Sequence, residues 1–108
     1  MNEELNVKVK FFSEKNGGRT LLPEDLLSIG EYRPHFVAGD PDQKTTNKTP
    51  ENYLGIAFIS QDEPLKEEKE IKATVSKIYP EVDYSTLITG ATFTIREGAK
   101  IVGNGSVL

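Results

Sequence analysis

The sequence predicts a single all-β domain over residues 1–108, a six-stranded antiparallel β-barrel. Three observations lead to this fold class. Short runs of residues alternate between apolar and polar, turns rich in glycine and proline separate the runs, and no segment carries an apolar stripe wide enough for a long helix. A β-sandwich would share these features. A closed barrel is preferred because it leaves no strand edge free to aggregate, and because strands broken by glycine suit a small barrel's bends.

Two strands are predicted in the first part of the chain. Residues 5–11 alternate cleanly and end before Asn16-Gly17-Gly18, where glycine allows a tight reversal. Residues 21–29 are expected to form a loop with at most one helical turn, whose leucines plug one end of the core. A second strand is predicted over residues 33–38, followed by a polar loop with two prolines over residues 39–52.

The middle of the chain supplies two more strands and one ambiguous segment. Residues 53–59 are apolar on both faces, so this third strand is expected to be covered on its outside as well. Residues 62–70 have helical propensity, but Leu65 alone cannot anchor a helix, which favours a charged surface loop. The fourth strand starts at Ile71, and Ile78 breaks its alternation, which indicates a bulge or a barrel corner.

The last part of the chain is predicted to form the fifth and sixth strands. Residues 80–90 are a connection, and residues 91–96 alternate as a fifth strand that ends in a turn at Glu97-Gly98. Residues 101–108 form the sixth strand. Its Gly103 and Gly105 indicate bulges or places where another backbone comes close.

Composition argues against catalysis. The chain has no cysteine, so disulfides, thiolate metal sites and cysteine nucleophiles are excluded. Its single histidine, His35, is interpreted as an ordinary hydrogen-bonding side chain and not as a metal ligand. Neither a phosphate-binding G-x-x-x-x-G-K-[ST] loop nor a G-x-S-x-G nucleophile motif occurs. We therefore expect a protein that is not an enzyme and that needs no metal or cofactor.

Charge and hydropathy bear on partners and location. Thirteen basic and seventeen acidic side chains give a net charge of −4, so any RNA contact would need a local basic patch. The first residues are acidic with no apolar stretch after them, and no segment is long and apolar enough to span a membrane. A cytoplasmic location is the expectation.

Three stretches, taken in order, resemble the third, carboxy-terminal domain of elongation factor Tu. They are Gly17-Gly18-Arg19-Thr20, then Tyr32-Arg33-Pro34-His35-Phe36, then Phe93-Thr94-Ile95-Arg96-Glu97-Gly98 followed by Val102-Gly103-Asn104-Gly105. The corresponding family runs read roughly G-G-R-H, Y-R-P-Q-F and F-A-I-R-E-G-G-R-T-V-G-A-G. The resemblance spans nearly the whole chain. It differs at His35, where the family has an amide, at the long loop after it, and at Ala99, where the family has a second glycine.

The resemblance implies a six-stranded antiparallel barrel and a binding role. In that family the barrel contacts the T-stem side of aminoacyl-tRNA and packs against protein partners, while a separate domain binds nucleotide. That nucleotide-binding domain has no counterpart here, so the resemblance does not carry GTPase activity. The implied binding residues are Arg19, Tyr32, Arg33, His35, Arg96, Glu97 and Gly98.

Two functions follow as hypotheses. The first is a free-standing, non-catalytic module that binds a protein partner, for which the translation machinery is the candidate source. The alternative is a tRNA-binding module that uses Arg33, His35 and Arg96, since guanidinium groups donate paired hydrogen bonds to phosphates. Arg33 and Arg96 can also be interpreted as surface residues paired with Glu31 and Glu97, which would carry no function.

Overall fold

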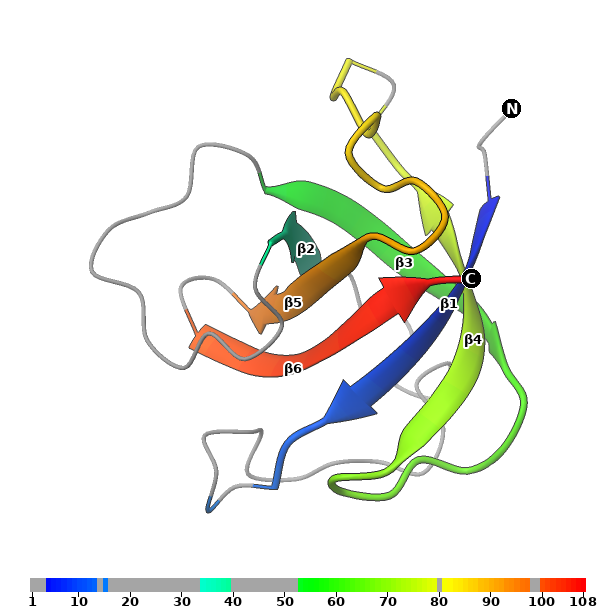
Figure 1. Cartoon of the computed structure of the whole chain (residues 1–108), viewed down its shortest axis with the longest axis vertical. Helices are drawn as coiled ribbons and strands as arrows, with labels where there is room; N and C mark the ends of the chain where they lie inside the picture. The colour runs from blue at the N-terminus through cyan, green and yellow to red at the C-terminus, as the bar shows by residue number, and fades with distance from the viewer. Residues whose placement is uncertain (1–3, 14, 16–33, 40–52, 80, 98–99) are drawn as a thin grey trace.

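The structure is a computed structural model that describes residues 4–13, 15, 34–39, 53–79, 81–97 and 100–108. Its described residues form six strands and no α-helix (Figure 1). The strands are β1 (Glu4–Phe11), β2 (His35–Ala38), β3 (Leu54–Gln61), β4 (Glu70–Lys77), β5 (Thr92–Glu97) and β6 (Lys100–Val107). The described residues therefore contain no helix that is long and apolar enough to cross a membrane.

The six strands close into a barrel in the order β1-β4-β3-β2-β5-β6, and every neighbouring pair is antiparallel. Closure comes from β6, which returns to pair with β1 so that Val7 lies opposite Val107. The all-β class, the strand number and the closed barrel predicted from the sequence are confirmed.

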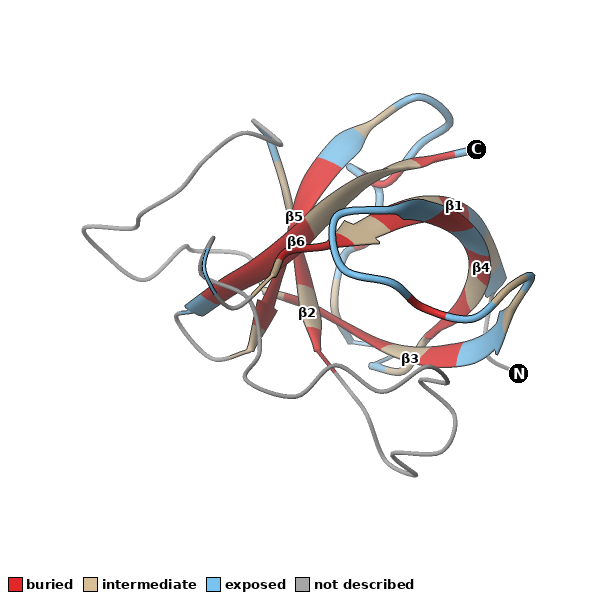
Figure 2. Cartoon of the chain, turned by 90° about the horizontal axis from the view of Figure 1, so that it is seen from below, coloured by how far each residue is buried: buried red, intermediate tan, exposed pale blue. Residues whose placement is uncertain are grey.

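Alternation decides which side chains fill the barrel. On β1, Val7, Val9 and Phe11 point inward and are at most 1% exposed, while the polar residues between them point outward. Inside, the rings of Phe36 and Phe93 stack with their centroids 4.0 Å apart. Figure 2 shows buried residues on the strands all around the barrel. The interior is a core packed with apolar side chains.

Gly103 and Gly105 allow β6 to approach its neighbours closely. A Cβ atom on Gly103 would press into the Lys10 carbonyl oxygen and lie 3.2 Å from Cδ1 of Ile95. A Cβ atom on Gly105 would press into the Lys8 carbonyl oxygen and lie 2.8 Å from the ring of Phe93. The prediction of close backbone approach at these two glycines is confirmed, because no other residue fits without displacing β1.

The connection between β3 and β4 is a loop, as its thin apolar stripe predicted. Residues 62–69 form no helix, and Leu65 is 4% exposed within the core cluster. Glu68 adopts a left-handed conformation with φ of 61°, and its N–H donates to the carbonyl of Phe11 at 2.7 Å. Leu65 thus plugs the end of the barrel at which β1 finishes and β4 begins.

The expected irregularity in the fourth strand lies elsewhere. β4 ends at Lys77, so Ile78 falls outside it, and the bulge belongs to the partner strand β3. There the pairing shifts between Phe58 and Ser60, which leaves Ile59 as the extra residue and exposes both Ile59 and Ser60. The predicted turn at 16–18, the loops at 21–29 and 40–52, and Gly98 lie outside the described residues.

Candidate functional site

The sheet register brings His35 and Arg96 together. They lie directly opposite each other on the antiparallel pair of β2 and β5, and His35 lies opposite Gly55 on its other side. Their neighbours Phe36 and Ile95 point into the core, so the row Gly55, His35 and Arg96 faces outward. Two of the residues that the sequence suggested for binding are therefore adjacent on the outer wall.

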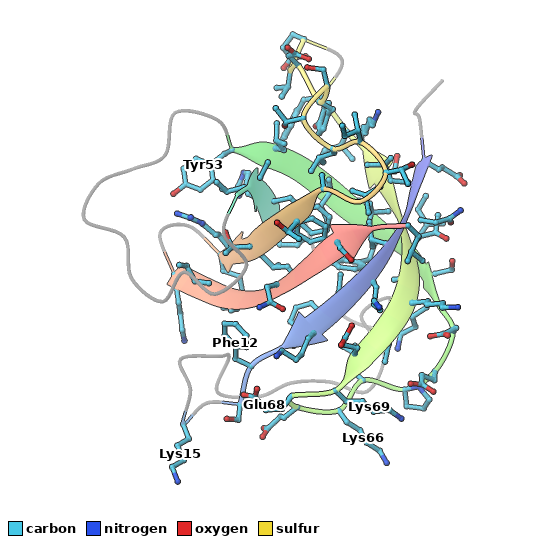
Figure 3. All side chains as sticks on the ribbon, viewed as in Figure 1. Phe12, Lys15, Tyr53, Lys66, Glu68 and Lys69 are labelled. Atoms are coloured by element: carbon cyan, nitrogen blue, oxygen red, sulfur yellow. The ribbon has the colours of Figure 1, made fainter. Side chains whose placement is uncertain are left out.

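His35 is half-buried and packs against Tyr53, the residue that precedes β3. The ring centroids are 5.0 Å apart at an interplanar angle of 65°, an edge-to-face arrangement that aromatic rings favour. Its Nδ1 atom is buried and has no hydrogen-bond partner among the described residues. Figure 3 shows Tyr53 on the outside of the barrel beside β2. The pair presents a partly exposed aromatic surface.

Arg96 is buried, with only 1% of its surface exposed. Its Nε donates to the hydroxyl of Thr94 at 3.0 Å, and Thr94, on the same outward side of β5, is also 1% exposed. β5 is therefore covered on its outer side at Thr94 and Arg96, and the interpretation of Arg96 as a surface residue is wrong. Burial favours a structural role for this guanidinium within the outer wall, and its part in binding stays a prediction.

The remaining suggested residues divide into two groups. Glu97 is half-buried at the end of β5 and lies opposite Lys100 of β6. Arg19, Tyr32, Arg33 and Gly98 lie outside the described residues.

Sequence reasoning missed a tyrosine cluster beside this row. The ring of Tyr79 covers the outer side of Gly55, where a Cβ atom would collide with it, and Tyr79 is 41% exposed. Tyr84 is buried, and its hydroxyl donates to the carbonyl of Gly55 at 2.5 Å and accepts from the N–H of Tyr79 at 3.3 Å. The sequence predicted that the third strand is covered on its outside, because both faces of that strand are apolar. The ring of Tyr79 confirms this covering at Gly55.

We call Tyr53, His35, Gly55 and Tyr79 the aromatic face. It combines two partly exposed phenol rings with an imidazole, on an outer wall held by strand pairing and by Tyr84. Among the described residues, His, Asp and Glu side chains do not gather in threes that could hold a metal ion. The chemistry that this face offers is stacking, apolar contact and hydrogen bonding.

Comparison with known proteins adds no relative to this description: no family model matches the chain, and a search of curated proteins finds no significant match.

Proposed function

We propose that this barrel is a non-catalytic interaction module that binds a protein partner through the aromatic face. The observation that carries the proposal is the edge-to-face pair of His35 and Tyr53 on the outer wall, next to the partly exposed ring of Tyr79. Tyrosine is enriched in protein interfaces because one rigid side chain supplies both apolar area and a hydrogen-bonding hydroxyl. The face is formed before any partner arrives, which lowers the entropy that binding must overcome.

The packed interior supports a function on the surface. A barrel that bound a small molecule inside would need an apolar cavity with converging polar groups. Here the inward positions carry valine, isoleucine, leucine and phenylalanine side chains that are almost completely buried. Among the described residues, recognition of a partner therefore falls to the outer wall of the barrel.

The resemblance to the third domain of elongation factor Tu suggests which kind of protein partner the barrel binds. A barrel of that kind would compete for the protein sites that the complete factor's barrel occupies. The closed six-stranded fold agrees with this, although a fold shared by many proteins does not identify a function.

The test is quantitative capture from lysate at moderate salt with the wild type and two double variants. One variant, His35→Ala with Tyr53→Ala, removes the aromatic pair. The matched control, Lys66→Ala with Thr86→Ala, truncates two exposed residues elsewhere. Arg96 is left intact because truncating a buried arginine would perturb the fold.

The proposal predicts a defined set of proteins that the wild type and the control retain and the aromatic-pair variant loses. Equal capture by all three would overturn it. Both protein and RNA are measured in each sample, so that tRNA captured through this face, with an affinity that falls steeply with salt, would establish the alternative function.

A further inference from the structure

Among the described residues, the pairing between β2 and β3 is the shortest of the pairings that close the barrel. It consists of His35 opposite Gly55 and Phe36 opposite Leu54. On its other edge β2 pairs with β5 along its whole length, from His35 to Ala38. Figure 1 shows β2 as a short strand between these two neighbours. We call His35, Phe36, Leu54 and Gly55 the β2–β3 seam.

Few backbone hydrogen bonds can cross this seam. In an antiparallel ladder, pairs whose backbone groups bond to each other alternate with pairs whose backbone groups point away. The N–H of Ile56 donates to the carbonyl of Pro34 at 3.1 Å, so these two residues form a bonded pair. The next bonded pair is Phe36 with Leu54, two residues along each strand. Because proline has no N–H to donate back, the ladder has one hydrogen bond fewer at Pro34.

The pair between them, His35 and Gly55, adds nothing to this ladder. By the same alternation, the backbone groups of these two residues point away from each other. The carbonyl of Gly55 accepts the hydroxyl of Tyr84 instead. Tyr84 thus ties β3 to the connection after β4, and that tie does not involve β2.

On the opposite edge, hydrogen bonds hold β2 to β5. The N–H of Gly39 donates to the carbonyl of Thr92 at 3.0 Å, and the Thr92 hydroxyl donates to the carbonyl of Gly39 at 2.7 Å. Two residues back, Val37 and Thr94 are opposite each other and form the next bonded pair. The backbone therefore fastens β2 more firmly to β5 than to β3.

The aromatic contacts show the same difference inside the barrel. The ring of Phe36 stacks on that of Phe93 of β5 with centroids 4.0 Å apart, whereas it meets Phe58 of β3 edge-on at 6.3 Å. On the outer side, the seam is spanned by the edge-to-face contact of His35 with Tyr53. This contact lies at the weakest pairing of the barrel.

We propose that the β2–β3 seam opens locally while β2 stays on β5, and that the contact of His35 with Tyr53 is the clasp that holds it closed. His35 belongs to β2 and Tyr53 directly precedes β3, so opening of the seam separates the two rings. Local opening occurs where few hydrogen bonds and few buried contacts hold a segment.

The opening controls whether the aromatic face exists. That face takes His35 from β2 and its other residues from the β3 side of the seam, so it is complete only in the closed barrel. A partner that binds the complete face stabilises the closed seam, because a ligand favours the state that binds it. This consequence rests on the proposed function, whereas the opening itself does not.

The test is hydrogen exchange of single backbone amides, followed by NMR on the protein alone. Phe36 and Val37 are a matched pair, because they are neighbours on β2 and their N–H groups point to β3 and to β5 respectively. Val7, on a strand that is paired on both edges, reports the opening of the whole barrel. After correction for intrinsic rates, the proposal predicts that Phe36 exchanges at least about tenfold faster than Val37.

Two variants test whether the opening is local and whether the clasp restrains it. Tyr53→Ala removes one ring of the clasp and is expected to speed exchange at Phe36 at least about threefold. Ile71→Val deletes a buried methylene group at the start of β4, whereas the part of β3 beside the seam pairs with the end of β4. It should speed exchange at Val7 and leave Phe36 unchanged, because β4 stays packed while the seam is open.

Three results would overturn the proposal: equal exchange at Phe36 and Val37, an unchanged rate at Phe36 in Tyr53→Ala, or a rate at Phe36 that rises with that of Val7 in Ile71→Val. None of them bears on capture of a partner, because the exchange measurement contains no partner. Equal lysate capture by the wild type and the aromatic-pair variant would remove the proposed function and leave the opening of the seam standing.

Discussion

Ser13 and Glu68, which are 55 residues apart in sequence, are joined by a hydrogen bond of 2.8 Å in which the Ser13 N–H donates to the Glu68 carboxylate. The Glu68 N–H in turn donates to the carbonyl of Phe11. Glu68 therefore fastens the loop after β3 to the end of β1 with both its backbone and its side chain. It does so in a left-handed conformation that costs an L-residue about 1 kcal/mol.

Two substitutions of Glu68 separate the stabilisation by its hydrogen bond to Ser13 from the cost of its left-handed conformation. Glu68→Ala removes the acceptor for Ser13 and keeps the backbone strain, so we expect the free energy of unfolding to fall by about 1 kcal/mol. Glu68→Gly also removes the acceptor but relieves the strain, so it should be the more stable of the two by about 1 kcal/mol. Urea unfolding of both variants measures the difference. An alanine variant as stable as the glycine variant would mean that Glu68 is not strained.

Gly105 is predicted to be intolerant of any side chain. Gly105→Ala places a methyl group against the Lys8 carbonyl and the Phe93 ring, and we expect a loss of about 2–3 kcal/mol in the free energy of unfolding. Ser106→Ala, at the neighbouring outward position, is the control and should change it by less than about 0.5 kcal/mol. Similar effects of the two substitutions, measured by chemical unfolding, would contradict the close approach of β6 to β1.

The hydroxyl of Tyr84 is predicted to stabilise the fold through Gly55. Tyr84→Phe deletes a buried hydrogen bond to the Gly55 carbonyl and leaves that oxygen without this donor, so we expect a loss of about 1–2 kcal/mol. Tyr79→Phe, at a ring that is 41% exposed, is the control with little expected effect. Thermal unfolding that ranked the two variants in the opposite order would show that Tyr84 does not anchor this segment.

Asp83 should titrate at unusually low pH. The Ser85 N–H donates to its carboxylate at 2.9 Å, and this hydrogen bond, with a second one from the Ser85 hydroxyl, lowers the pKa of Asp83 below its ordinary value. Because the pKa is lower in the folded state, the stabilisation is present above the ordinary pKa and is lost as pH falls through the lowered one.

An NMR titration of the Asp83 carboxyl carbon checks this directly. Ser85→Ala keeps the backbone donor and should return the pKa only part of the way toward its ordinary value. A wild-type midpoint at or above the ordinary value would contradict the hydrogen bond to Ser85.

The barrel could be predicted because its determinants are local. The alternation of Val7, Val9 and Phe11 fixes which side of β1 faces the core, and Gly103 and Gly105 mark the close approach of β6. The failure of residues 62–69 to form a helix also follows locally, since Leu65 is the single apolar anchor in that segment.

The candidate site was less predictable because it depends on pairing between distant strands. His35 and Arg96 meet only through the register of β2 and β5, and Tyr79 covers Gly55 only because β4 pairs with β3. From the sequence alone Arg96 could be interpreted as a surface residue, yet it is buried, because a single strand's pattern does not show what lies against its outer side. For the same reason the sequence indicates a bulge or a barrel corner at Ile78, whereas the pairing shift lies between Phe58 and Ser60 of the partner strand β3.

The most direct measurement of the central claim is site-specific photo-crosslinking from the aromatic face. A photoreactive phenylalanine analogue replaces Tyr53, and the same analogue at the exposed Thr86 serves as the control. The account predicts a protein crosslinked from position 53 and not from position 86, and lost when His35→Ala is added. Crosslinks of equal yield from both positions, or crosslinks to RNA alone, would contradict it.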